Sequence, residues 1–203
     1  MSYSQIGQDL EVLKFYNNKT EGYYIEIGAT NGIFLSNTYL LEKDYNWKGI
    51  CVEPVPKNYE KLVINRPNSF CCDRAVYNES DKEVIFDVAA CNLLSGIGAH
   101  IDCHKKTVDA NKTQIIVKTI TFNDLLEKYN APFFIDYLSI DTEGSELEIL
   151  KSVDLQKYTF GLIDVEHNYQ EPRRTQIREL LTLNGYEFIR QNKFDDCYKH
   201  KFL

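Results

Sequence analysis

The chain has 203 residues, of which 43% are hydrophobic and 26% are charged, and its 30 acidic and 23 basic side chains give a formal net charge of −7. This length and composition predict one ordinary globular domain whose core needs neither disulfides nor a structural metal. The negative charge argues against a nucleic acid or an anionic membrane as partner, because both bind clustered Lys and Arg side chains.

Two further features concern the cellular compartment. No apolar run approaches the ~18 residues of a membrane span, and the first five residues lack the basic and apolar regions of a signal peptide. The six cysteines, which include no C-x-x-C pair, are expected to be reduced thiols that pack as small hydrophobic side chains; they are Cys51, Cys71, Cys72, Cys91, Cys103 and Cys197. These observations predict a soluble, cytoplasmic protein without a membrane span.

The first third of the chain alternates strands and helices. Apolar periodicity predicts a helix over residues 4–16, followed by a strand that Gly28 stops. The expected elements after that helix are a strand at 23–27, a helix at 36–45, a strand at 49–52, a helix at 57–65 and a strand at 69–72. This βαβαβ order predicts a parallel sheet with right-handed crossovers.

Residues 77–118 break the alternation and are expected to form an insertion over the sheet edge. Strands are predicted at 83–89 and 114–118, with a Gly-rich and polar stretch between them. Its glycines suit a lid that shapes the acceptor site. His100 and His104 in this stretch have the i, i+4 spacing of metal ligands on a helix, although loop histidines are more often solvated.

The last third resumes the alternation. The expected elements are a helix at 121–129, a strand at 137–140, a helix at 146–152, a strand at 160–165, a helix at 173–183, and two strands at 186–190 and 197–202. The last two strands are close enough in sequence to form only an antiparallel hairpin. With no linker or repeat, residues 1–203 are expected to form a single domain.

Acidic residues follow strand after strand. In an open α/β sheet, ligands bind beyond the carboxyl ends of the strands, where this chain places Glu26, Glu53, Asp73, Asp141, Glu143 and Glu166. The turn after the first strand is G-x-x-x-G, which lacks the pyrophosphate-binding pattern G-x-G-x-x-G. Glu53 lies where a carboxylate accepts hydrogen bonds from an adenosine ribose. A ribose without a phosphate, beside acidic groups, indicates the sulfonium cofactor S-adenosylmethionine.

Five sequence strings together resemble the FkbM-type S-adenosylmethionine-dependent O-methyltransferases. They begin at Ser4, Glu26, Ser36, Trp47 and Leu138, and read SQIGQD, EIGATNG, SNT, WKGICVEP and LSIDTEGSE. The resemblance implies a Rossmann-like class I methyltransferase fold, an α/β fold with a seven-stranded, mostly parallel sheet and a C-terminal antiparallel hairpin. It also implies methyl transfer to a hydroxyl, commonly on a sugar or polyketide. The chain departs from the family's frequent D-I-G-A-N-x-G at Glu26 and at Thr30-Asn31.

The resemblance and the residues at the strand ends predict the cofactor site. The expected cofactor-binding residues are Gln5, Glu26, Gly28, Ala29, Asn31, Gly32, Ser36, Glu53, Pro54, Asp73, Arg74 and Asp141. Several have simpler interpretations, such as a helix cap for Gln5 or a surface ion pair for Asp73 and Arg74.

The expected catalytic residues are Asp141, Glu143 and His167. Asp141 would lie near the transferring methyl, Glu143 would orient the acceptor or bind a metal, and His167 would be the general base. A purely structural imidazole or a helix cap is the alternative. Asp141, Glu166 and Asn168 offer the oxygen ligands that Mg²⁺ prefers.

The sequence thus predicts an S-adenosylmethionine-dependent O-methyltransferase that acts on a sugar or glycan, with rhamnose or fucose as the expected deoxyhexose. Because the chain opens almost at its first motif, it could also be a domain of a longer glycosylation enzyme. Two alternatives remain: a nicotinamide-dependent oxidoreductase on a similar sheet, and a non-catalytic module that uses the same fold for binding.

Overall fold

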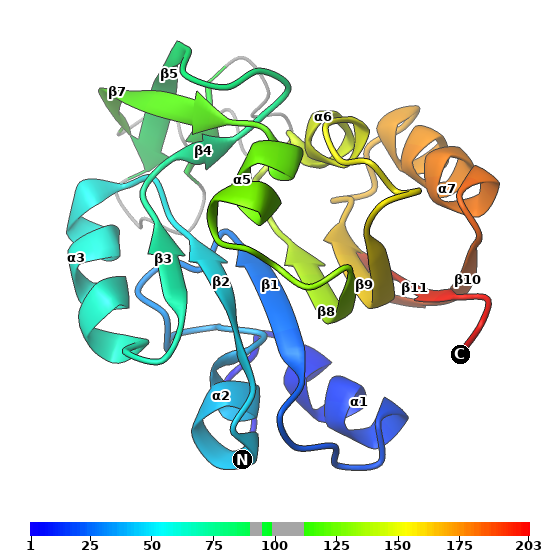
Figure 1. Ribbon diagram of the computed structural model, residues 1–203. Helices are drawn as coiled ribbons and strands as arrows, with labels where there is room; N and C mark the ends of the chain where they lie inside the picture. The colour runs from blue at the N-terminus through cyan, green and yellow to red at the C-terminus, as the bar shows by residue number, and fades with distance from the viewer. Residues whose placement is uncertain (90–94, 99–111) are drawn as a thin grey trace.

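A seven-stranded sheet forms the centre of the molecule in the computed structural model, which describes residues 1–89, 95–98 and 112–203 (Figure 1). The strand order is β10-β11-β9-β8-β1-β2-β3. Their bounds are β1 Tyr23–Ile27, β2 Lys48–Val52, β3 Phe70–Cys72, β8 Phe134–Ile140, β9 Thr159–Glu166, β10 Tyr186–Asn192 and β11 Asp195–His200. The neighbours from β9 to β3 pair in parallel, whereas β11 runs antiparallel to both β9 and β10. The expected mostly parallel sheet with a terminal hairpin is confirmed.

Helices cover both faces of this sheet. Alternating strand residues divide the core into two layers, so that Tyr24 packs with one set of helices and Ile25 with the other. The first layer contains α1 Gln8–Phe15, α2 Tyr39–Tyr45 and α3 Pro56–Asn65, and the second contains α5 Phe122–Lys128, α6 Glu146–Lys151 and α7 Arg173–Leu183. The result is a three-layer α/β/α arrangement. The strand order reverses between β1 and β8, and folds of this kind bind ligands at such a reversal.

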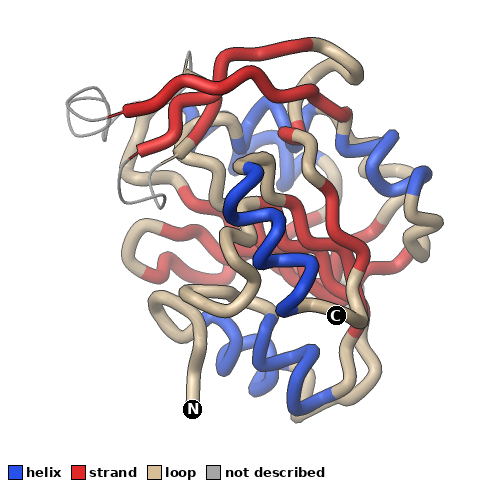
Figure 2. The backbone as a smooth tube through the Cα atoms, turned by 90° about the vertical axis from the view of Figure 1, so that its left-hand side faces the viewer, coloured by secondary structure: helices blue, strands red, loops and turns tan. Residues whose placement is uncertain are grey.

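A second sheet lies beyond the carboxyl ends of β2 and β3. Its order is β4-β7-β5-β6, with bounds β4 Ala75–Val76, β5 Glu83–Ala89, β6 Gly96–Ile97 and β7 Lys112–Ile120. Figure 2 shows these strands running across the top of the molecule, apart from the main sheet. A small apolar core joins them to the segment after β2, through contacts among Val55, Phe86 and Val117. Within the segment predicted as an insertion, the described strands β5 and β6 and most of β7 therefore belong to this second sheet.

Two helices begin later than their periodicity predicts, for a local reason in each case. The expected helix over residues 4–16 begins at Gln8, because Gly7 has a left-handed φ of 86° and the Ser4 hydroxyl donates to Asp9. The expected helix over 36–45 begins at Tyr39, because the three preceding residues hydrogen-bond to a buried carboxylate. In both places polar side chains hold the backbone in a non-helical conformation.

Several predictions concern residues that are only partly described. Cys51, Cys71, Cys72 and Cys197 are free thiols as expected, while Cys91, Cys103, His100 and His104 lie outside the described residues. The lid predicted around these histidines also falls largely outside them. Among the described helices, we find none with the length and apolar character required to cross a bilayer.

Candidate active site

A cavity of about 400 Å³ opens between the two sheets at the carboxyl ends of the central strands. This volume lies within the range of small-molecule sites. Eight of the predicted site residues line it: Gln5, Gly28, Glu53, Pro54, Asp141, Glu143, Glu166 and Asn168. The main sheet thus supplies polar strand ends, and the second sheet supplies apolar residues such as Val76, Phe86 and Ile97.

The turn after β1 is built around a close backbone approach. Gly28 has a φ of 97°, and a Cβ at this position would lie 1.9 Å from the carbonyl oxygen of Asp141. The Gly28 amide donates to the carbonyl of Val52 at 3.1 Å, and the Asp141 amide donates to that of Ile27 at 3.0 Å. Glycine is therefore required to bring the ends of β1, β2 and β8 together around the cavity.

Glu53 directly follows β2 and is a buried carboxylate on the cavity wall. Its Oε1 accepts a hydrogen bond from the Val55 amide at 2.8 Å, and 5% of the residue is exposed. Burial raises the pKa of this carboxyl to about 7. A buried acceptor of this kind suits hydroxyl donors of a ligand.

Three further carboxylates meet on the cavity wall, from the loop after β8 and the end of β9. Ligand oxygens of Asp141, Glu143 and Glu166 all lie within 4.8 Å of one another. Oε2 of Glu166 is buried and has no hydrogen-bond partner among the described residues. Burial and the neighbouring Asp141 raise the pKa of Glu166 well above its usual range. Such a cluster attracts a cation or holds a proton.

Comparison with known proteins identifies the family. The model of the methyltransferase FkbM domain matches residues 26–188, which is most of the chain. The chain belongs to the FkbM methyltransferase family. A comparison with curated proteins gives no match for this FkbM methyltransferase.

Solved structures support the fold of this FkbM methyltransferase. A TehB-like SAM-dependent methyltransferase from Corynebacterium glutamicum is 8% identical, with a TM-score of 0.50, over 96% of this chain and 87% of the other. The precorrin-6y C5,15-methyltransferase of Geobacter metallireducens is 10% identical, with a TM-score of 0.50, over 94% and 84%. A METTL16 methyltransferase domain is 12% identical, with a TM-score of 0.53, over 97% and 66%. At these identities the likeness concerns the class I methyltransferase fold.

Eight other predicted residues of the FkbM methyltransferase lie outside the cavity lining, as far as the described residues show: Glu26, Ala29, Asn31, Gly32, Ser36, Asp73, Arg74 and His167. Three of them support the first turn. Asn31 Oδ1 accepts from the Ile33 amide at 3.0 Å, and Gly32 has a φ of 82° with Arg66 packed against it. Ala29 is buried, and its amide donates to Val52.

Glu26 is surrounded by donors from the protein itself. Its carboxylate accepts from the hydroxyls of Ser36 and Thr38 at 2.9 and 2.7 Å, and from the Asn37 amide at 2.6 Å. The fully buried Arg66 guanidinium lies 3.5 Å away. Glu26 and Ser36 therefore hold the loop before α2 in place.

His167, the predicted general base, turns away from the cavity. Its Nδ1 accepts a hydrogen bond from the Tyr169 amide at 2.9 Å and is therefore unprotonated, while Nε2 lies 3.5 Å from Asp196. Burial lowers the pKa of this imidazole. Glu166, the preceding residue, lines the cavity instead.

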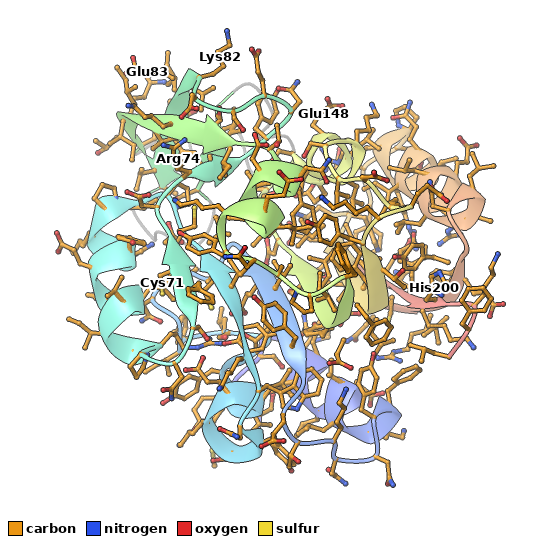
Figure 3. All side chains as sticks on the ribbon, in the orientation of Figure 1. Cys71, Arg74, Lys82, Glu83, Glu148 and His200 are labelled. Carbon is orange, nitrogen blue, oxygen red and sulfur yellow. The ribbon has the colours of Figure 1, made fainter. Side chains whose placement is uncertain are left out.

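The end of β3 also differs from the expected adenine contacts. Asp73 is exposed, and Arg74 forms an ion pair with Asp81, which lies in the turn before β5. Figure 3 shows Arg74 at the second sheet, below the labelled Lys82 and Glu83. Ala75 and Val76, the two residues of β4, line the cavity here. An apolar surface replaces the predicted charged one.

Sequence reasoning missed several lining residues, among them Asn37, Phe86, Ile97 and Phe194. Asn37 belongs to the S-N-T string that resembles the family, and this string is the sequence feature that could have indicated it as a site residue. Phe86 lies in β5 between the exposed Ile85 and the buried Asp87, so the burial along this strand does not follow the simple alternation that a sequence pattern can reveal. The sequence contains no local signal that places β6 or the β10-β11 turn at the cavity.

Proposed function

We propose that this chain is an O-methyltransferase that transfers the methyl of S-adenosylmethionine to a hydroxyl of a sugar or glycan, with a deoxyhexose such as rhamnose or fucose as the first candidate. The observation that carries this proposal is the cluster of Asp141, Glu143 and Glu166 on the cavity wall. It would stabilise the cationic sulfonium and provide an acceptor for the proton that the hydroxyl loses.

The proposed cofactor orientation follows the order of the strand ends. The ribose hydroxyls would donate to Glu53 after β2, and the adenine would lie against the apolar Ala75 and Val76 of β4. Gly28 would let the methionyl part approach the backbone of the first turn. The sulfonium would then face the carboxylates that follow β8 and end β9.

The proposed reaction is an in-line displacement at the methyl carbon. The acceptor oxygen forms the new C–O bond while the C–S bond breaks, and its electron pair remains on sulfur in S-adenosylhomocysteine. The hydroxyl proton passes to Glu166 in its carboxylate form, which the adjacent cationic sulfonium would favour, and its Oε2 has no partner among the described residues. Alignment of oxygen, carbon and sulfur supplies much of the rate, and proton removal supplies the rest.

A neutral acceptor suits this cavity better than a nucleic acid. A phosphate near Asp141, Glu143 and Glu166 would meet like charges. Hydroxylated sugars carry no charge and can hydrogen-bond to such carboxylates. An RNA oligonucleotide is therefore the appropriate contrasting substrate.

The same carboxylates, with the nearby cavity residue Asn168, also suit Mg²⁺. We include this cation in the proposal because Glu166 presents a buried oxygen without a described partner. When bound, Mg²⁺ would lower the pKa of the acceptor hydroxyl. The test is chelation: we expect EDTA to reduce the methyl-transfer rate and added Mg²⁺ to restore it. An undiminished rate would remove the cation and leave the carboxylates as the only proton acceptors.

Replacement of Glu166 tests the proposed proton transfer. We expect Glu166→Gln to lower kcat for methylation of methyl rhamnoside or methyl fucoside by ~100-fold or more, because the proton acceptor is lost. Binding of S-adenosylhomocysteine should change only slightly. Glu148→Gln is the matched control, since Glu148, which is labelled in Figure 3, lies on α6 and pairs with Lys151. Full activity of Glu166→Gln would contradict this role.

We further propose that the chain acts as a single methyltransferase domain in the cytoplasm, where thiols such as the vicinal Cys71 and Cys72 stay reduced. The family match favours methyl transfer over the nicotinamide-dependent alternative. A non-catalytic role would be supported if no acceptor in a broad glycan panel, RNA included, received a methyl group.

A further inference from the structure

Asn37 is a buried residue of the cavity wall with an unsatisfied acceptor. It is 8% exposed, and its Oδ1 is buried without a hydrogen-bond partner among the described residues. A buried amide oxygen of this kind is costly unless a donor reaches it. Because Asn37 lines the cavity, that donor can come from the ligand.

The orientation of this amide is fixed from two sides. The Asn37 backbone amide donates to Glu26 at 2.6 Å, and its Nδ2 donates to the Ser139 hydroxyl at 2.8 Å. Glu26 is in turn held by the Ser36 and Thr38 hydroxyls. The oxygens of Glu26 are therefore occupied by donors from the protein. Glu26 acts as a positioning residue that orients Asn37.

The position of Asn37 in the sheet indicates which part of the cofactor it meets. Ser139, which anchors the Asn37 amide, lies on β8 opposite Glu26 of β1, whereas Glu53 follows β2 and Val76 lies beyond β3. A cofactor with its ribose at Glu53 and its adenine at Val76 extends its methionyl part toward β1 and β8. The donor on that part is the α-ammonium group.

We propose that Asn37 Oδ1 accepts a hydrogen bond from the α-ammonium group of S-adenosylmethionine, and that Glu26 contributes only by holding Asn37 in place. This inference rests on the cofactor of the proposed function but not on its acceptor. A neutral amide suits this role, because it binds the ammonium without repelling the neighbouring methionyl carboxylate. Asn37 would thus select ligands that carry the amino-acid group.

Two ligands separate this role from a general structural one. S-adenosylhomocysteine carries the amino-acid group, and 5′-methylthioadenosine keeps the adenosine and sulfur but lacks it. We expect Asn37→Ala to weaken S-adenosylhomocysteine binding by roughly 10- to 100-fold, the range for a hydrogen bond to a charged group. Binding of 5′-methylthioadenosine should stay within about twofold, because the lost partner is absent from it. Isothermal titration calorimetry measures both.

Asn68→Ala is the matched control, because Asn68 is exposed between α3 and β3 and lies outside the cavity lining. It should leave both affinities unchanged. An equal loss for both ligands in Asn37→Ala would show that Asn37 only shapes the site, and no loss for either would show that the ammonium binds elsewhere. Both results overturn the inference. If the unmodified protein bound neither ligand, the assignment of the cofactor itself would fall, whereas absent methyl transfer with intact binding would count only against the proposed acceptor.

Discussion

Glu53 combines burial with a proposed ligand contact, so its charge affects folding and binding in opposite directions. Burial raises the pKa of its carboxyl from 4.5 to about 7. A raised carboxyl pKa means that the folded state binds the proton more tightly than the unfolded state does. Folding stability is therefore lost as the pH rises from 4.5 to about 7, by up to about 3 kcal/mol.

Glu53→Gln should remove this loss. We expect the variant to be more stable than the unmodified protein at pH 8, by up to about 3 kcal/mol, and to show no such gain near pH 4.5. Urea unfolding at the two pH values measures this. The exposed Glu60 of α3 provides the control Glu60→Gln. A gain of equal size at both pH values would contradict the role of the Glu53 charge.

The same substitution should weaken cofactor binding. A glutamine keeps one oxygen acceptor but loses the charge that strengthens hydrogen bonds from the ribose hydroxyls. We expect a roughly 10-fold rise in the Kd of S-adenosylhomocysteine at pH 8. Calorimetric titration of both proteins tests it, and an unchanged Kd would place the ribose elsewhere.

The sequence predicted the types of residue at the site better than their individual orientations. Glu53, Asp141 and Glu166 were predictable, because they directly follow or end strands whose carboxyl ends meet at one edge. The contacts that surround the Glu26 carboxylate were not predictable, because one of them comes from the buried Arg66, which is 40 positions away in sequence. The orientation of His167 likewise depends on Asp196 in the last strand.

At the scale of elements, the close approach of the β1 turn to the loop after β8 requires Gly28. Gly28→Ala has two costs. It forces a residue with a Cβ into a left-handed φ, and the new Cβ overlaps the Asp141 carbonyl oxygen. We expect a loss of about 3 kcal/mol or more in the free energy of unfolding. Cofactor binding should fall with it, because the turn lines the cavity.

Gly7→Ala is the control for backbone conformation alone. Gly7 has a φ of 86°, and no described atom lies within 4 Å of a Cβ placed there. The expected loss is about 1 kcal/mol. Chemical denaturation compares the two variants, and equal losses would mean that the approach of Gly28 to Asp141 imposes no constraint.

The second sheet forms one wall of the cavity through β5. Phe86 is 7% exposed and lines the cavity, while its neighbour Ile85 is 56% exposed on the other face of the strand. We expect Phe86→Leu to weaken S-adenosylhomocysteine binding by roughly 2- to 10-fold, through the lost ring contact with adenine. Ile85→Ala should leave the affinity unchanged. Equal affinities of Phe86→Leu and the unmodified protein would place the adenine away from β5.

The elements of the main sheet were predicted closely because their apolar strands alternate with amphipathic helices. The expected strand at 23–27 coincides with β1, and the expected helix at 173–183 coincides with α7. β4 and β6 contain two residues each and exist only through pairing with longer strands, so periodicity cannot reveal them.

At the scale of the whole molecule, cofactor binding should stabilise the fold. The cavity contacts both sheets, so a ligand there links the β1 turn, the loop after β8 and the second sheet. At a concentration 100 times its Kd, S-adenosylhomocysteine should add about 2.7 kcal/mol, which corresponds to a Tm rise of about 5–10 °C for a chain of this length. NAD should give no shift in the same thermal scan. A rise with NAD and none with S-adenosylhomocysteine would support the nicotinamide-dependent alternative.

The chain has a net charge of −7, and several of its acidic side chains gather at one place in the molecule. Glu53, Asp141, Glu143 and Glu166 line the cavity, whereas Glu26 lies outside its lining and pairs with the buried Arg66. Charge composition alone argued against polyanionic partners. The position of these acidic side chains at the strand ends favours a sulfonium cofactor together with a neutral acceptor.

The most direct test of this account is transfer of an isotopically labelled methyl group from S-adenosylmethionine to a panel of saccharides that includes rhamnosides and fucosides, with an RNA oligonucleotide alongside. Mass spectrometry and NMR would locate the labelled carbon. We expect the labelled methyl group on a hydroxyl oxygen of a sugar, formed together with an equal amount of S-adenosylhomocysteine. Label on RNA, or on a nitrogen or carbon atom, would contradict it.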